Sequence, residues 1–180
     1  MSIISSSYFV QEISIPTNSD NTNIDNVITR YEPEILKMVL GYELWDLIKG
    51  NPSTPDRLNE LINGLEYTES YDGRDQKVKW NGLANTDLKS LIAYYVYFMW
   101  QTNHVTTTSN LGEKASLVEL TERADPSQKA AHAWYLMRQL VGYNGQHILE
   151  PSLYNFLTKY TDTYPEWVFK DVGIVTMFGL

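Results

Sequence analysis

Apolar residues recur every three or four positions through much of the chain, the spacing that places them on one face of an α-helix. The first such run begins after Asn23, whose side chain can cap a helix. Pro33 suits the first turn of a second helix, which Gly41 can end, and Thr54 with Pro55 suits the start of a later one. The helices expected in this part of the chain cover residues 24–31, 33–40, 44–49 and 55–64.

Residues 66–80 change from the helical pattern to one typical of β-strands. The stretch EYTESYDGRDQKVKW carries the dipeptide Asp72-Gly73 between two segments that contain tyrosine, valine and tryptophan. An Asp-Gly pair between such segments is a strong local signal of a β-hairpin. We therefore expect one hairpin over residues 66–80.

Residues 91–100, LIAYYVYFMW, contain no charged side chain. Their apolar side chains extend around most of a helical cylinder, which indicates a central helix, with Asn85 or Thr86 as its cap. The run is too short to cross a bilayer, because a membrane-spanning helix needs about 20 residues. We expect a core helix over residues 86–103, in which Tyr94 and Tyr97 face a neighbouring molecule.

The second half of the chain predicts two further helices. A loop is expected over residues 104–113, and a weakly helical or irregular piece follows it. Asp125 and Pro126 suit the start of a helix that Gly142 can end, and Pro151 opens a short final helix that reaches Tyr160.

These patterns predict an all-α fold: a small helical bundle with one β-hairpin insertion and extended arms at both ends. The 180 residues are most simply one domain. We divide the chain into an N-terminal arm (1–22), the bundle with its hairpin (23–164) and a C-terminal arm (165–180). The apolar residues of the arms would be costly to leave in water, so each arm either folds back or docks on a neighbour.

Composition narrows the partners that the chain can have. The formal net charge of −8 argues against a protein that grips phosphates, although an acidic wall could let DNA pass without binding it. Thirteen tyrosines and five tryptophans suit either an aromatic core or a protein interface. The chain has no cysteine, and its first residues lack the pattern of a secretory signal, so we expect assembly in a cytoplasm.

The sequence nominates no catalytic, metal or cofactor site. His104 and His132 have no histidine or glutamate three or four residues away, and His147, with Glu150 three residues later, lies in an expected loop, so no histidine has the partner on a helix that a helical metal site needs. Asp72 to Asp75 lack the ligand series of a calcium loop, and no glycine-rich phosphate loop or nucleophile elbow is present. We therefore expect neither a cofactor nor an enzyme.

Several segments, taken in order, resemble a known family. They are IDNVITRYEPEILKMVLGYELWDLIKG, a hairpin that ends in KWNGL, the tyrosine-rich LKSLIAYYVYFMWQTNHVTTTSNLGE, and a late YPEW. In order and texture they resemble the head-to-tail connector, or adaptor, proteins of tailed bacteriophages and prophages. The resemblance covers roughly residues 22–170.

This resemblance implies a non-enzymatic structural protein of the virion neck. Such adaptors form a ring, usually a dodecamer, beneath the portal protein, and they receive the next neck or tail protein while DNA passes through the lumen. No membrane is involved. On this basis we assign contacts with the portal or with neighbouring copies to both arms and the hairpin tip: Tyr8, Phe9, Val10, Tyr71, Asp72, Gly73, Arg74, Trp167, Phe169 and Phe178.

Three alternatives remain open from the sequence. Trp167 and Phe169 could cover the core of their own bundle instead of docking on a neighbour. The chain could be a soluble aromatic-rich binding module for a carbohydrate or a protein, since tyrosine and tryptophan rings stack on sugars. It could also be a small helical enzyme with a site assembled from scattered residues, none of which the sequence identifies.

Overall fold

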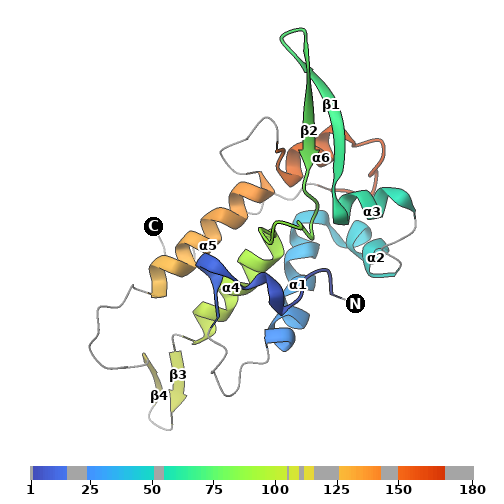
Figure 1. Cartoon of the computed structure of the whole chain (residues 1–180). Helices are drawn as coiled ribbons and strands as arrows, with labels where there is room; N and C mark the ends of the chain where they lie inside the picture. Colours follow the sequence, from blue (N-terminus) through green and yellow to red (C-terminus); the bar gives the residue numbers. More distant parts are fainter. Residues whose placement is uncertain are drawn as a thin grey trace.

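A computed structural model describes seven stretches of the chain: residues 2–15, 24–50, 55–104, 106–109, 112–115, 126–142 and 150–168 (Figure 1). Two 3-10 turns come first, followed by six α-helices and four strands. In chain order the elements are η1 (Ser6–Tyr8), η2 (Gln11–Ile13), α1 (Ile24–Leu40), α2 (Tyr42–Gly50), α3 (Asp56–Asn63), β1 (Leu65–Tyr71), β2 (Arg74–Trp80), α4 (Leu91–His104), β3 (Thr106–Ser109), β4 (Gly112–Ala115), α5 (Pro126–Val141) and α6 (Leu153–Lys159).

Helix α4 forms the centre of the molecule, as its apolar sequence predicts. It lies between α1 and α5, and every residue from Leu91 to Phe98 is buried (Figure 1). Its tyrosines do not face a neighbour as expected: Tyr94 and Tyr97 are 3% and 1% exposed. Within the described stretches, no helix is both long enough and apolar enough to cross a bilayer.

The all-α prediction is wrong, because the fold is mixed, mostly helical with antiparallel strand pairs. The expected hairpin forms from β1 and β2, with Tyr71 paired to Arg74. A second pair, β3 and β4, occupies Thr106–Ser109 and Gly112–Ala115, where we expected a loop leading into an irregular piece. The two pairs lie toward opposite ends of α4 (Figure 1).

Helix α1 runs without interruption through Pro33, where the sequence predicted two separate helices. Proline lacks an N–H, so this helix loses the hydrogen bond that residue 33 would otherwise donate to the Thr29 carbonyl. Buried side chains on both sides of the proline, among them Ile28 and Ile35, pack into the same core. Tertiary packing therefore keeps one helix where the local signal favours a break.

Helix α4 starts at Leu91, five residues later than predicted, and its cap is Ser90. The Ser90 hydroxyl accepts a hydrogen bond from the Ile92 N–H at 3.2 Å and donates one to the Leu83 carbonyl at 2.7 Å. Asn85, one of the two expected caps, adopts a positive φ of 44° and donates to the Lys89 carbonyl at 3.0 Å. Its side chain therefore shapes the turn before the helix.

The N-terminal segment folds onto the body instead of extending from it, which corrects the predicted arm. Ile4, Phe9 and Ile13 are buried in the core, and the segment lies across α4 (Figure 1). The Ile3 and Ile4 N–H groups donate to the buried carboxylate of Glu32 on α1, at 3.0 to 3.3 Å. Burial raises the pKa of Glu32 above its usual value.

Candidate interaction surface

The β1–β2 hairpin projects from the helical body, and its turn is the part farthest from the helices (Figure 1). Asp72 and Gly73 have φ angles of 51° and 72°, and two positive φ angles in a two-residue loop define a type I′ turn. This turn matches the right-handed twist of the strands and sets the register from Tyr71–Arg74 down to Leu65–Trp80.

Contacts with α6 and α3 hold the hairpin at its foot. The Trp80 ring stacks on Phe156 at 5.0 Å between centroids, and its indole N–H donates to the Leu61 carbonyl at 3.1 Å. Gly64 and Gly82 meet here: a Cβ on Gly82 would lie 2.4 Å from the Ile62 carbonyl oxygen. The foot is therefore a closely packed joint.

A second group of contacts extends this support along the hairpin. The Lys159 ammonium lies 3.0 Å from a carboxylate oxygen of Glu69 and 4.1 Å from the centre of the Tyr67 ring. A hydrogen bond from Lys159 lowers the pKa of Glu69, and burial raises the pKa of Tyr67 to about 12. The Tyr67 ring also meets the edge of Tyr160 at 5.7 Å.

The structure brings four of the predicted contact residues together at the free end of the hairpin. Tyr71, Asp72, Gly73 and Arg74 are all exposed. The Tyr71 hydroxyl donates to Glu69 at 2.9 Å, so the ring is held beside its own strand. The tip thus presents an aromatic ring, an acid and a base on a supported strand pair.

The predicted contacts of the N-terminal arm are split between core and surface. Phe9 is 7% exposed and belongs to the core, whereas Tyr8 is partly buried against it. Val10 is 38% exposed and is the residue of the three that a partner could readily reach. Hydrophobicity alone does not separate a side chain that folds back from one that docks elsewhere.

Residues 165–168, the described part of the C-terminal arm predicted over residues 165–180, lie on the body instead of extending from it. The Trp167 indole N–H donates to the Val39 carbonyl at 3.2 Å, and its ring meets Tyr154 edge-on at 5.8 Å. Trp167 therefore covers its own core, the alternative left open above. Phe169 and Phe178 lie outside the described residues.

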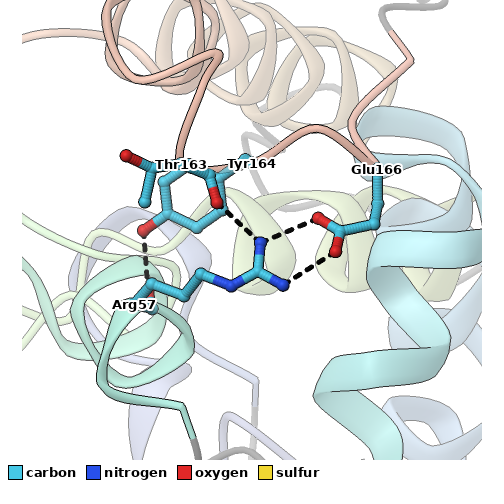
Figure 2. Close-up of polar contacts among 4 residues, drawn as sticks. All are labelled: Arg57, Thr163, Tyr164 and Glu166. Atoms are coloured by element: carbon cyan, nitrogen blue, oxygen red, sulfur yellow. Dashed lines mark hydrogen bonds and ion pairs between the residues drawn. The ribbon is translucent and has the colours of Figure 1, made fainter.

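Arg57 fastens this end of the chain to α3 (Figure 2). Its guanidinium binds both carboxylate oxygens of Glu166, at 2.7 and 2.8 Å, and donates to the Thr163 carbonyl at 2.6 Å. In return, the Tyr164 hydroxyl donates to the Arg57 carbonyl at 2.7 Å. The hydrogen bonds from Arg57 lower the pKa of Glu166.

Other exposed apolar side chains escaped the sequence analysis. Tyr42 is 64% exposed and Val168 58%, and Val168 lies against Gly41, the neighbour of Tyr42. Leu47 and Tyr135 are 39% and 52% exposed. Tyr42, Leu47 and Tyr135 lie on helices whose other apolar side chains are largely buried, and Val168 follows α6. Their apolar character alone therefore does not mark them as exposed.

The hollows of the body are lined by groups that already support the fold. A cavity of about 550 Å³ lies between the N-terminal segment, α1, α2 and α3, where Glu32 binds the backbone of residues 3 and 4. A smaller one, about 220 Å³, lies beside Trp80 and Ser152. The described stretches contain no group of three or more acidic or histidine side chains placed to hold a metal ion.

Contacts between buried tyrosines and acids at the surface also join elements of the fold. Tyr94 donates to Glu12 and Tyr95 to Glu34, each at 2.6 Å, which ties α4 to the N-terminal segment and to α1. Burial raises the pKa of both tyrosines, and the hydrogen bond from Tyr94 lowers the pKa of Glu12. His132 is exposed on α5, whereas the side chain of His104 and all of His147 lie outside the described part.

Comparison of the chain with known protein families, with curated proteins and with solved structures finds no match. The β1–β2 hairpin is the candidate site, because it brings predicted contact residues together on an element that extends beyond the body.

Proposed function

We propose that this chain is a structural ring subunit of the head-to-tail connector of a tailed bacteriophage or prophage. It binds the portal protein on one side, its own copies around the ring, and the next neck or tail protein on the other side. It acts in the virion neck, without enzymatic activity, and DNA passes through the lumen. The observation that carries the proposal is the projecting hairpin with its exposed, supported tip.

The hairpin suits a contact function because its foot is held to the body while its outer end is exposed. Two-stranded hairpins are marginally stable alone, and here the foot and Lys159 hold the strands to the body. The outer end receives this support while its own residues stay in water. Such a supported projection suits insertion against another protein.

The buried aromatic rings favour a structural subunit over a carbohydrate-binding module. Aromatic side chains along α4 pack in the core, where Phe98 meets Trp134 at 4.8 Å between centroids. The exposed tyrosines of the described part, Tyr42, Tyr71 and Tyr135, belong to three different elements. They do not form a continuous platform along one element, as sugar stacking would favour.

The portal protein is proposed as the partner because of the sequence resemblance. The net negative charge of the chain agrees with the proposed passage of DNA. A net charge of −8 weakens attraction to the DNA backbone, as a channel through which DNA slides would need. The aromatic ring and the two opposite charges at the tip suit contact with a protein surface.

The test is cryo-electron microscopy of this protein mixed with the portal protein encoded nearest to it. We expect a symmetric collar of added density beneath the portal. A portal that stays bare, beside a folded free subunit, would overturn the proposal. Two variants then test which predicted contact binds the portal protein. One is a double substitution at the hairpin tip, Tyr71→Ala with Arg74→Ala, and the other is a chain that ends at residue 170.

The two variants report on different predicted contacts. Removing residues 171–180 deletes Phe178 and should abolish portal attachment while the remaining chain still folds. The tip variant leaves the buried face of the hairpin, Val78 and Trp80, unchanged. Lys129→Ala, at an exposed position on α5, is the matched surface control and should leave attachment unchanged. Normal attachment of the shortened chain would contradict the C-terminal assignment.

A further inference from the structure

The register of the β1–β2 hairpin determines which backbone groups point away from it. In an antiparallel pair, residues that exchange hydrogen bonds alternate with residues that do not. Tyr71 and Arg74 flank the two-residue turn and form a hydrogen-bonded pair, so every second pair down the ladder does the same. The residues in between direct their N–H and C=O groups outward.

These outward groups form two matched edges. We call Glu66, Thr68 and Ser70 the β1 edge, and Asp75, Lys77 and Lys79 the β2 edge. Each β1-edge residue lies opposite one β2-edge residue within the hairpin. All six side chains are exposed, and within the described stretches none of their backbone groups takes part in a hydrogen bond outside the hairpin.

The two strands differ in charge. Strand β1 carries two acids and no base, whereas β2 carries three bases and one acid. Open strand edges pair readily with other chains, and charged side chains on an edge decide which pairings are permitted. On the edges themselves, β1 carries one acid, Glu66, and β2 carries two bases and one acid, so the β1 edge of one hairpin is opposite in net charge to the β2 edge of another.

We infer that the hairpin joins neighbouring copies by β-sheet extension, the β1 edge of one copy pairing with the β2 edge of the next. The occupant of each edge is a second copy of this chain. This inference rests on the proposed ring, and it names the contact that would hold the ring's own subunits together. Repeated around the axis, the contact joins all hairpins into one closed antiparallel sheet.

Ring symmetry brings the correct backbone groups together. Copies related by rotation alone hold their hairpins at the same height and in the same direction, so β1 of one runs antiparallel to β2 of the next. Glu66 then meets Lys79 of the neighbouring copy, Thr68 meets Lys77, and Ser70 meets Asp75. These are the residues whose N–H and C=O groups point outward, so the inter-subunit ladder needs no shift in register.

Sheet closure favours this head-to-tail pairing over pairing between identical edges. Two β2 edges related by a twofold axis would place Lys77 directly opposite its own copy, a like-charge contact, although the same register sets Asp75 opposite Lys79. Two β1 edges would leave Glu66 without a basic partner across the interface. Either twofold arrangement also leaves two edges open, whereas a closed sheet has none.

Disulfide trapping between single-cysteine variants tests the inference, because the natural chain contains no cysteine. Thr68→Cys and Lys77→Cys are made in separate chains, which prevents a bridge within one hairpin. Hydrogen-bonded antiparallel residues have Cα atoms about 5.5 Å apart, within the range that a disulfide spans. The two proteins are mixed, assembled on the portal protein, oxidised and resolved by non-reducing electrophoresis.

We expect a cross-linked heterodimer from the mixture and little cross-linking from either variant alone. Thr68→Cys mixed with Lys129→Cys, whose cysteine lies on α5, is the control and should stay monomeric. Homodimers of one variant as the main product would overturn the inference in favour of twofold pairing. A collar beneath the portal without any heterodimer would also overturn it.

The same experiment separates this inference from the proposed function. A collar without the cross-link leaves the connector proposal standing and removes the hairpin as the ring contact. A cross-link between copies in solution, with no collar on the portal, supports the hairpin contact and contradicts the connector proposal. Electron microscopy and electrophoresis of the same sample provide the two readings.

Discussion

Arg57 shows how one side chain can hold a chain end in place. Its bidentate contact with Glu166 and its bond to the Thr163 carbonyl join α3 to the residues that follow α6 (Figure 2). Bidentate pairs between arginine and a carboxylate fix direction as well as distance. Trp167, one residue beyond Glu166, lies on the body through its own hydrogen bond to the Val39 carbonyl.

Glu166→Gln should destabilise the protein by about 1 kcal/mol at neutral pH, because it removes the charge that Arg57 binds. The folded pKa of Glu166 lies below its ordinary value, so the stabilisation is complete above the unfolded pKa. It is lost as the pH falls through the folded pKa. Urea unfolding of both proteins at decreasing pH should therefore show a difference that shrinks below about pH 4.

Glu43→Gln is the matched control for this measurement, because Glu43 is exposed on α2. Its stability difference from the natural protein should be small throughout the pH range. An equally large effect of both substitutions would show that overall charge, and not the Arg57 contact, produces the pH dependence.

Tyr94→Phe tests the contact that ties the N-terminal segment to α4. The substitution removes the hydroxyl that donates to Glu12 at 2.6 Å and should cost about 1 kcal/mol of unfolding free energy. Since this hydrogen bond is the main cause of the lowered pKa of Glu12, that pKa should rise toward its usual value. Carboxyl NMR titration measures the pKa, and urea unfolding measures the stability.

Tyr135→Phe supplies the comparison, because Tyr135 is 52% exposed and its hydroxyl only accepts from Gln139 on the same helix. We expect almost no change in stability. An unchanged pKa of Glu12 in the Tyr94→Phe variant would contradict the contact.

At the scale of elements, the hairpin depends on its foot more than on its turn. Gly82 has a φ of 81°, and an added Cβ would lie 2.4 Å from the Ile62 carbonyl oxygen. Gly73 in the turn has a similar φ of 72°, but nothing lies within 4 Å of an added Cβ. Replacing Gly73 by alanine therefore introduces backbone strain alone, whereas replacing Gly82 introduces the same strain and a steric clash.

Gly73→Ala should cost about 1 kcal/mol, the strain of a positive φ alone. Gly82→Ala should cost at least twice as much, because the backbone of α3 and the hairpin must also move apart. Thermal unfolding gives both values. Equal losses in the two variants would show that close packing at Gly82 contributes nothing.

Elements with strong local signals could be predicted from the sequence, and those decided by packing could not. The dipeptide Asp72-Gly73 favours a hairpin, and the apolar circumference of α4 favours a central position, so the predicted hairpin and the predicted central helix were both correct. The break expected at Pro33 failed because core packing holds α1 together across it. The β3–β4 pair was missed because its strands, TTTS and GEKA, lack an alternation of apolar and polar residues.

The candidate site was predictable to the same extent. The hairpin tip follows from a local turn signal, so the sequence places its four residues together at the turn, and their role in binding a partner stays a prediction. In the arms the only signal was the hydrophobicity of the side chains. A residue that packs on its own core is as hydrophobic as one that packs on a neighbouring molecule. Phe9 and Trp167 belong to the first kind, as their contacts show.

At the scale of the whole molecule, the body buries a core of apolar side chains, whereas the hairpin leaves the edges of its strands exposed to water. The body closes on itself, with α4 at its centre and both chain ends, as far as residues 2 and 168, lying against it. The β1 and β2 edges keep outward backbone groups that the body does not use. Association through these edges would leave the fold of the subunit unchanged.

Thr68→Pro should prevent ring formation while preserving the folded subunit. Residue 68 directs its N–H away from β2, so proline removes no hydrogen bond within the hairpin, and edge positions of this kind tolerate it. The neighbouring copy would lose that donor and meet the proline ring instead. We expect stability within about 1 kcal/mol of the natural protein.

Thr68→Val is the control, because valine keeps the N–H and the β-branched shape. Hydrogen exchange at Glu69 and Gln76, which bond within the hairpin, should show that both variants retain the strand pair. Particle masses in the presence of the portal protein should then show rings with valine and none with proline. Since backbone pairing between copies requires an unblocked β1 edge, rings assembled from the proline variant would exclude sheet extension as the contact that builds them.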